Sequence, residues 1–203
     1  MNTTEVKIKY RIKNFSDLYK LAKKQFIDFE KVEGIDDWKE YNFSIDCAKD
    51  QLKFKDMLQI RFIEELTEAT SALDNLDHFQ EEMTDAVNFF LSAYIMADID
   101  LSKLPYPELN KDKSEIELPS FKDCSTLFYK IIHEVGGLCN LLKNRPWTQS
   151  NYLVSLYDFQ KRSEKLWTTF WTTIKELGIS EKTIFELFER KYLVNQWRIR
   201  TGY

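Results

Sequence analysis

Apolar residues recur at intervals of three and four along most of this chain, and this spacing constrains the fold more than any other feature. Residues three or four apart share one face of an α-helix, so each such stretch predicts a helix with one buried side. The predicted helices run from Phe15 to Phe29, Asp50 to Leu76, Phe79 to Ile99, Thr126 to Leu142, Leu153 to Leu177 and Glu181 to Trp197. Only 5 Gly and 4 Pro occur in 203 residues, which disfavours a sandwich or barrel of short strands. The sequence therefore predicts an all-α fold, a helical bundle.

The composition limits the ligands that such a bundle can bind. Glycine-rich phosphate loops need several glycines in register, whereas the only close pair here is Gly136-Gly137. The formal net charge is −4, so no basic field would attract a nucleic-acid polymer. The longest nearly apolar run, Ala86 to Ala97, is too short to cross a bilayer. We expect neither a nucleic-acid polymer nor a membrane as a partner.

Cysteine and histidine are few and scattered. Cys47, Cys124 and Cys139 lie far apart, and His78 and His133 are isolated from them and from each other. This pattern excludes a zinc site and a disulfide framework. A reducing cytoplasm is the expected location.

We expect one domain over residues 1–203, built from two halves. Residues 1–100 form the first half and residues 123–203 the second. Residues 101–122 contain Pro105, Pro107 and Pro119 together with a Lys-Asp-Lys-Ser-Glu segment, which cannot sustain a core helix. They predict a solvent-exposed linker.

The two halves resemble each other. Phe79-Gln80 and Phe159-Gln160 each precede an aromatic-rich helix, and Glu65 has a counterpart in Glu134. One interpretation is a degenerate internal duplication of a helical hairpin. The other is that two amphipathic helices of similar length look alike by chance.

Two pairs of carboxylates form the most informative pattern. Glu65 with Glu68, and Glu82 with Asp85, are each spaced by three, so each pair lies on one face of its helix. Four carboxylates converging from two antiparallel helices repel one another unless a cation lies between them. Ligation by oxygen alone favours Mg²⁺, or Mn²⁺, over zinc. The pattern predicts a divalent metal site with these four residues as ligands.

The alternative is that these acids form a solvated face, as most runs of charge do. Apolar neighbours such as Leu66 and Met83 favour the metal site, because they draw the acids toward the bundle. In the second half, Arg162 and Lys165 occupy the positions of the second acidic pair. We therefore expect one metal site per chain.

Basic and amide side chains gather near the C-terminus. Lys191, Asn195 and Arg198 recur at intervals of four and three and so share one helical face. The planar guanidinium of Arg198 suits phosphate oxygens. The alternative is a basic helix end that complements the helix dipole.

The acidic pattern, ExxE followed by ExxD on the next helix, resembles the metal motif of the all-α nucleoside triphosphate pyrophosphatases, which include the MazG proteins and the dimeric dUTPases. The C-terminal residues Lys191, Asn195, Arg198 and Gly202-Tyr203 resemble the closing signature of the dimeric dUTPases and of the phage dCTPase/dUTPases. The likeness covers most of the chain and is weakest before Trp38.

The resemblance implies a Mg²⁺-dependent pyrophosphohydrolase that converts dUTP, with dUDP and dCTP as further candidates, to the monophosphate. It implies that Glu64 or Glu65 takes up the proton of the attacking water. It also implies a homodimer and, for a phage-encoded chain, a location in the host cytoplasm. The residues that it implies for substrate binding are Gln25, Trp38, Asn88, Lys191, Asn195 and Arg198.

Departures from the family pattern leave the base open. Tyr192 and Ile199 replace an Asn and a Gln of the signature, and a short Asp74 to His78 segment replaces a tryptophan-rich one. A house-cleaning hydrolase of a modified or purine nucleotide is therefore one alternative. A non-catalytic helical regulator of the same fold is the other.

Aromatic residues support the expectation of a homodimer. The helices carry more aromatic side chains than one bundle of this size is expected to bury, and we predict that some of them form a subunit interface. The residues in question are Phe89, Phe90, Tyr94, Trp167, Phe170 and Trp171.

Overall fold

A computed structural model describes residues 12–32, 34, 43–111, 117–144, 147 and 152–202. Helices make up nearly all of the regular structure in these ranges, and no strand occurs in them. The α-helices are α1 (Phe15–Val32), α2 (Ala48–Lys55), α3 (Phe62–Ser71), α4 (Leu76–Met96), α5 (Phe121–Cys139), α6 (Leu156–Glu176) and α7 (Glu181–Thr201). The predicted all-α fold is confirmed. Trp38 lies outside the described residues.

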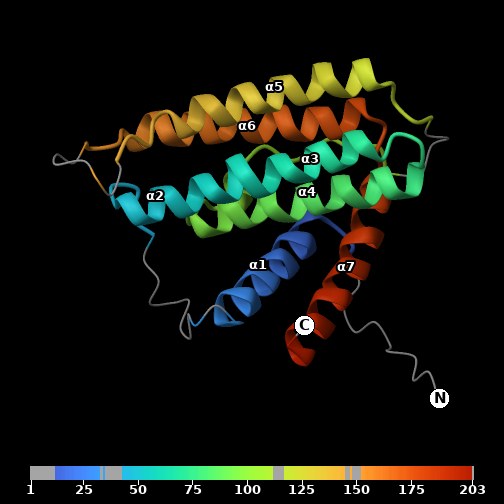
Figure 1. Cartoon of the computed structure of the whole chain (residues 1–203), viewed down its shortest axis with the longest axis horizontal. Coiled ribbons are helices and arrows are strands. Elements are labelled where there is room, and N and C mark those ends of the chain that lie inside the picture. Colours follow the sequence, from blue (N-terminus) through green and yellow to red (C-terminus); the bar gives the residue numbers. More distant parts are fainter. Residues whose placement is uncertain are drawn as a thin grey trace.

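The predicted helix from Asp50 to Leu76 is divided in the structure. It consists of α2, a π-helical segment η1 (Asp56–Arg61) and α3, which follow one another as one long rod (Figure 1). The rod ends at Ser71, and Asn75 begins α4 by accepting a hydrogen bond from the backbone N–H of His78 at 3.2 Å. The predicted end of the helix at Leu76 lies too late, because apolar spacing continues across the turn between α3 and α4. The capping side chain of Asn75 marks the start of a new helix there.

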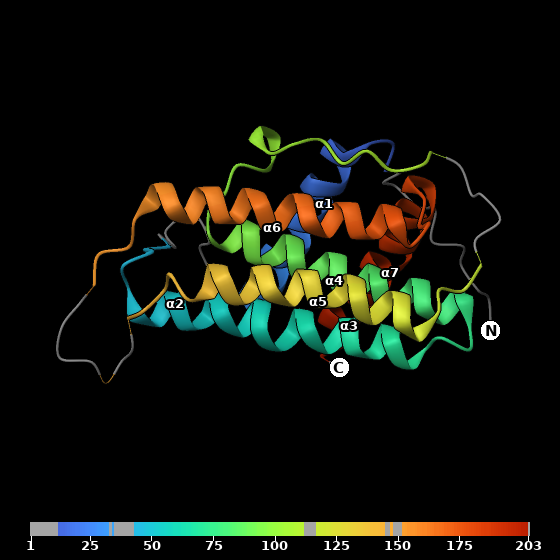
Figure 2. The ribbon, with the colours of Figure 1, turned by 90° about the horizontal axis from the view of Figure 1, so that it is seen from above.

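Two hairpins form the body of the molecule. One hairpin is α3 with α4, the other is α5 with α6, and they lie against each other along their length (Figures 1 and 2). Helices α1 and α7 contact each other and α4, and they cross α4 on the side away from α5. Aromatic side chains of α1 also pack against Trp167 and Trp171 of α6. The face of α4 toward α1 and α7 is where the candidate site lies.

Five of the six aromatic residues that were predicted to be in excess of what one bundle buries are in fact in its core, and the sixth, Phe89, is half-buried. Phe90, Tyr94, Trp167, Phe170 and Trp171 are all buried within this single chain. They pack ring against ring between α4 and α6, with the Phe90 and Phe170 centroids 4.2 Å apart. Such contacts stabilise a core beyond the area that they bury. The homodimer stays a prediction, but these side chains do not support it.

The linker prediction was wrong in one respect. After the short 3-10 helix η2 (Leu101–Lys103), the described part of the segment runs over the bundle beside α1 (Figure 2) and packs on it. Leu101 and Pro107 are buried, and the Trp167 indole N–H donates to the carbonyl of Pro105 at 2.8 Å. The prolines do prevent a long helix, but a prolyl carbonyl still accepts hydrogen bonds. Most of its described residues are exposed, as predicted, but Leu101 and Pro107 anchor the segment on the bundle.

Within the described ranges, none of the helices combines the length and apolarity needed to cross a membrane.

Candidate active site

Three carboxylates converge where α3 faces α4. Glu65 comes from α3, while Glu82 and Asp85 lie one turn apart on α4. One oxygen from each lies within 4.8 Å of the others. Ligand oxygens around Mg²⁺ are about 3 Å apart when cis and about 4.2 Å apart when trans, so these three carboxylates would have to draw closer together to share one coordination shell.

Electrostatics in this cluster favour a bound cation. Burial, reinforced by the charges of Asp85, Glu68 and Glu82, raises the pKa of Glu65 to about 8. Burial also raises the pKa of Asp85, although the Lys191 ammonium opposes that shift. The folded chain thus resists full ionisation of its own acids, and a divalent cation would relieve the repulsion. The donors are all oxygen, which fits Mg²⁺ or Mn²⁺.

The two other predicted acids lie apart from this trio. Glu68 is exposed and is not one of the three converging carboxylates, but its charge contributes to the raised pKa of Glu65. Glu64 is also exposed, and its carboxylate is 3.8 Å from the guanidinium of Arg61. Of the acids on α3, the structure therefore brings only Glu65 into the cluster.

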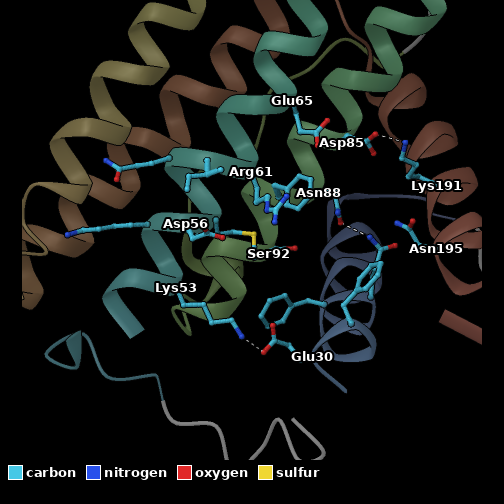
Figure 3. A pocket seen from close by; sticks show the side chains of 18 of the residues that line it. Glu30, Lys53, Asp56, Arg61, Glu65, Asp85, Asn88, Ser92, Lys191 and Asn195 are labelled. Carbon is cyan, nitrogen blue, oxygen red and sulfur yellow. Dashed lines mark hydrogen bonds and ion pairs between the residues drawn. The ribbon is translucent and has the colours of Figure 1, made fainter. Parts of the chain in front are cut away.

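Helix α7 brings basic side chains to the cluster from the other side. The Lys191 ammonium forms an ion pair with the carboxylate of Asp85, as Figure 3 shows. Asn195, one turn further along, is buried, and with Arg198 it lines the same cavity. The predicted face of Lys191, Asn195 and Arg198 thus lines the cavity, and Lys191 contacts the acids.

A cavity of about 980 Å³ extends from the acidic cluster between α1, α4, α7 and the rod. Glu65, Asp85 and Lys191 line one end of it. At the other end lie Glu30 and Lys53 (Figure 3), whose charged groups are 2.5 Å apart. Between the two ends, Figure 3 shows polar side chains of Asp56, Arg61, Asn88 and Ser92. The same cavity is also lined by apolar side chains, from Phe26, Phe29, Met57, Ile60 and Phe89.

The family of the chain follows from a comparison with known sequences. A family model described as dUTPase matches residues 68–203, which is well over half of the chain and includes Glu82, Asp85 and the C-terminal signature. The chain belongs to the dUTPase family. No curated protein and no solved structure matches it. Family membership implies a nucleotide pyrophosphatase hydrolase. The match begins three residues after Glu65, so it does not include that residue.

Two amides lie on the cavity wall of this dUTPase-family chain. Gln25 on α1 donates through Nε2 to Oδ1 of Asn88 on α4 at 2.7 Å. Gln25 is only 1% exposed, and its Oε1 has no hydrogen-bond partner among the described residues. A buried acceptor without a donor is costly, so this oxygen is suited to a donor group of a ligand.

Several cavity residues of the dUTPase-family chain were missed from the sequence. Lys53 and Glu30 lie 23 positions apart on different helices, and no local pattern links them. Asp56 and Arg61 reach the cavity from η1, whose wider turn cannot be read from apolar spacing. A signal did exist for Arg61, because it precedes Glu65 by four and so shares its helical face.

The second hairpin of the dUTPase-family chain repeats the geometry with opposite charge. Glu82 and Asp85 fall at the seventh and tenth positions of α4, and Arg162 and Lys165 fall at the seventh and tenth positions of α6. Opposite these two cations lies buried Glu134, with Oε1 2.7 Å from the Lys165 ammonium and Oε2 3.8 Å from the Arg162 guanidinium. We call Glu134, Arg162 and Lys165 the counterpart cluster. An ion-pair cluster stands there in place of an acidic one.

Proposed function

We propose that this chain is a Mg²⁺-dependent nucleoside triphosphate pyrophosphohydrolase that converts dUTP to the monophosphate, with dUDP and dCTP as further candidate substrates. One observation carries the proposal. Glu65 and Asp85 of the acidic trio and Lys191 of α7 line one end of a cavity that is also lined by apolar side chains and by the amides of Gln25 and Asn88. Phosphates fit the charged end, and a nucleoside fits the remainder.

The metal ligands in this proposal are Glu65, Glu82 and Asp85, joined by Glu68 if its exposed side chain turns inward. Bound there, Mg²⁺ would offset the charge of the phosphate oxygens and lower the pKa of the attacking water. The His78 imidazole, whose Nε2 is 2.8 Å from a Glu82 oxygen, restrains that carboxylate from the solvent side. Restraint of this kind keeps a ligand oriented.

The chain's own cations would hold the phosphates. Lys191 and Arg198 line the cavity, with Lys191 in contact with Asp85, and an arginine fork suits two phosphate oxygens at once. Asn195 offers an amide on the same wall. These groups neutralise charge that builds up as the phosphate bond breaks.

For the proton acceptor we propose Glu65 rather than Glu64. The carboxylate of Glu65 lines the cavity, whereas that of Glu64 is exposed and lies beside Arg61. A general base must lie within hydrogen-bond reach of the water that it deprotonates. The other proposed acceptor, Glu64, would have to turn toward the cavity first.

The nucleoside would bind between the amides and the apolar wall. Gln25 Oε1 would accept from a donor of the base or sugar, and Asn88 would contact the sugar. Stacking by Trp38 remains part of the proposal.

The test is a substrate panel with purified protein. The panel contains dUTP, dUDP, dCTP, dTTP, dATP and UTP, each with Mg²⁺ and with EDTA, and pyrophosphate and orthophosphate are measured separately. We expect Mg²⁺-dependent release of pyrophosphate from dUTP. The variant Glu82→Gln should lose this activity, while Glu164→Gln, on the exposed face of α6, should keep it. Equal turnover of dUTP by Glu82→Gln and Glu164→Gln would contradict the proposed site.

A house-cleaning activity is the second candidate, favoured by the ion pair of Glu30 and Lys53 at the end of the cavity far from the acids. A charged pair at that place suits a base with an additional polar substituent. Adding 5-hydroxymethyl-dCTP, dITP and 8-oxo-dGTP to the panel separates the candidates. A higher kcat/KM for one of these than for dUTP would favour house-cleaning.

We also propose that the chain forms a homodimer. The exposed face of α5 carries Phe121, Tyr129 and Ile132, which are 67%, 69% and 45% exposed. Apolar side chains gathered on one face are typical of an interface.

A further inference from the structure

Lys191 has two possible partners of negative charge. Its ammonium contacts Asp85, which is one of the three clustered carboxylates. The same side chain lines the large cavity, at the end where the proposed function places the phosphates. A single positive group thus lies between the acidic trio and the site of the nucleotide phosphates.

Space around Lys191 permits a change of partner. Asp85 and Lys191 line the large cavity on one side and a cavity of about 240 Å³ on the other. The side chain of Lys191 is 36% exposed, whereas that of Asp85 is 14% exposed. The lysine can therefore move without opening the core.

The backbone of α7 does not need to follow this movement. The neighbouring Tyr192 and one face of the preceding turns, Phe185 and Phe188, are buried against the bundle. Arg190 holds a separate ion pair with Glu81 on α4. Helix α7 stays docked when only the Lys191 side chain changes its contact.

We propose that Lys191 is an exchangeable counterion that couples metal binding to nucleotide binding. It neutralises Asp85 while the trio holds no ion, and it transfers to the phosphates when metal and nucleotide are both bound. The inference rests on the proposed function. A divalent ion that binds without nucleotide must displace Lys191 from Asp85. The displaced ammonium then lies near the positive charge of the ion, and this repulsion weakens binding of the ion. Nucleotide phosphates give the displaced ammonium a new partner, so each ligand strengthens binding of the other.

The counterpart cluster shows a lysine that neutralises a buried acid where no acidic trio is present. Lys165 occupies the position of Asp85 on the second hairpin and neutralises buried Glu134. Arg162, rather than an acid, occupies the α6 position that corresponds to Glu82. In the first hairpin the lysine comes from a third helix, so the acids stay available for a metal ion.

The experiment measures Mn²⁺ binding rather than turnover. Free Mn²⁺ is followed by electron paramagnetic resonance, with full-length protein alone and with the non-hydrolysable α,β-imido analogue of dUTP. For the native chain we expect weak Mn²⁺ binding that the analogue strengthens. In Lys191→Met, Mn²⁺ alone should bind at least about fivefold tighter, at the lower end of ordinary coupling between sites, and the analogue should add less.

Two control variants separate this role from a merely structural one. Lys191→Arg keeps the charge and should keep the weak binding of Mn²⁺ alone. Arg190→Met removes the adjacent cation, whose partner is Glu81 and not the trio, and should leave Mn²⁺ affinity unchanged. Thermal melting of each variant verifies that it is folded.

The outcomes distinguish the inference from the proposed function. If the native chain binds Mn²⁺ and Lys191→Met binds it no tighter, the counterion role is wrong while the metal site stands. If neither binds Mn²⁺ with or without the analogue, the metal site of the proposed function is wrong, and the inference with it.

Discussion

The Lys165 ammonium lies 2.7 Å from Oε1 of Glu134, at the α6 position that corresponds to Asp85 on α4. A lysine thus neutralises a buried acid of the second hairpin. Because Glu134 is 6% exposed, the cation that faces it matters for folding.

Lys165→Met should destabilise the fold. The substitution would leave Glu134 buried with only the more distant Arg162 as a partner. We expect a loss of about 1 to 2 kcal/mol in the free energy of unfolding, a value kept low because solvent screens the exposed lysine. Urea denaturation measures this. Lys122→Met, on the exposed side of α5, is the matched control and should change stability little. Equal stability of the two variants would contradict a structural role for the counterpart cluster.

The acidic trio should make stability depend on pH in the absence of divalent ions. The pKa of Glu65 is raised to about 8 in the folded chain, so its contribution is fully present below its ordinary value of 4.5 and is lost as pH rises through about 8. Asp85 shifts in the same direction, Glu82 and Glu68 add negative charge, and Lys191 opposes them. Melting curves in EDTA between about pH 5 and pH 9 should show this decline for the native chain and a weaker one for Glu65→Gln.

Mg²⁺ should reverse that decline. A ligand that binds only the folded chain raises its melting temperature, and the gain should be larger near pH 8 than near pH 5, where protons compete for the carboxylates. Calorimetry with and without Mg²⁺ measures the gain, which Glu65→Gln should abolish. A Mg²⁺ response that is the same in both proteins would place the ion elsewhere.

Arg198 should matter for turnover and not for metal binding. Removing one donor to developing charge costs roughly 2 to 4 kcal/mol, so Arg198→Ala should lower kcat/KM about thirtyfold to several hundredfold. Its gain in melting temperature with Mg²⁺ should equal that of the native chain. Full activity in Arg198→Ala would show that the basic face of α7 has a structural role only.

Gln25 should contribute to nucleoside binding. Gln25→Leu removes the donor to Asn88 and the acceptor that faces the cavity, and we expect binding of dUMP to weaken by about 1 to 3 kcal/mol. Titration calorimetry with dUMP and with pyrophosphate separates the two ends of the cavity. Affinity for pyrophosphate should be unchanged, and a parallel loss for both ligands would indicate general damage to the fold.

The exposed face of α5 should hold the dimer together. Light scattering of the native chain should give twice 24.3 kDa at micromolar concentration. Ile132→Lys should shift the mass toward the monomer, because it buries a charge in an apolar contact. Thr168→Lys, at an exposed position of α6 rather than of α5, is the control. A native monomer would leave the exposed apolar residues of α5 without this role.

Local pattern was enough to predict the helices and the acidic pairs. Spacing by three places Glu82 and Asp85 on one face of α4 without knowledge of the rest of the chain. It also places Lys191, Asn195 and Arg198 together. These relationships lie within one helix, where geometry follows from sequence number.

Contacts between distant helices were beyond this reasoning. That Lys191 meets Asp85, or that Lys53 meets Glu30, depends on how α7 and α1 cross the bundle. The burial of Trp167 and Phe170 has the same cause, because a count of aromatic residues carries no information on how well they pack. Whether Glu64 faces the cluster depends on how α3 is rotated about its own axis, and α3 directly follows η1 in the chain.

The π-helical segment η1 sets that rotation. Each residue of an α-helix advances about 100° around the axis, and a π-turn inserts one residue without breaking the rod. If these same residues formed a regular α-helix instead, α3 would turn relative to α2 by about a quarter of a revolution. Lys53 or Glu65 could then face the cavity, but not both. The segment sets the rotation of one end of the rod relative to the other, so that both ends face the same ligand.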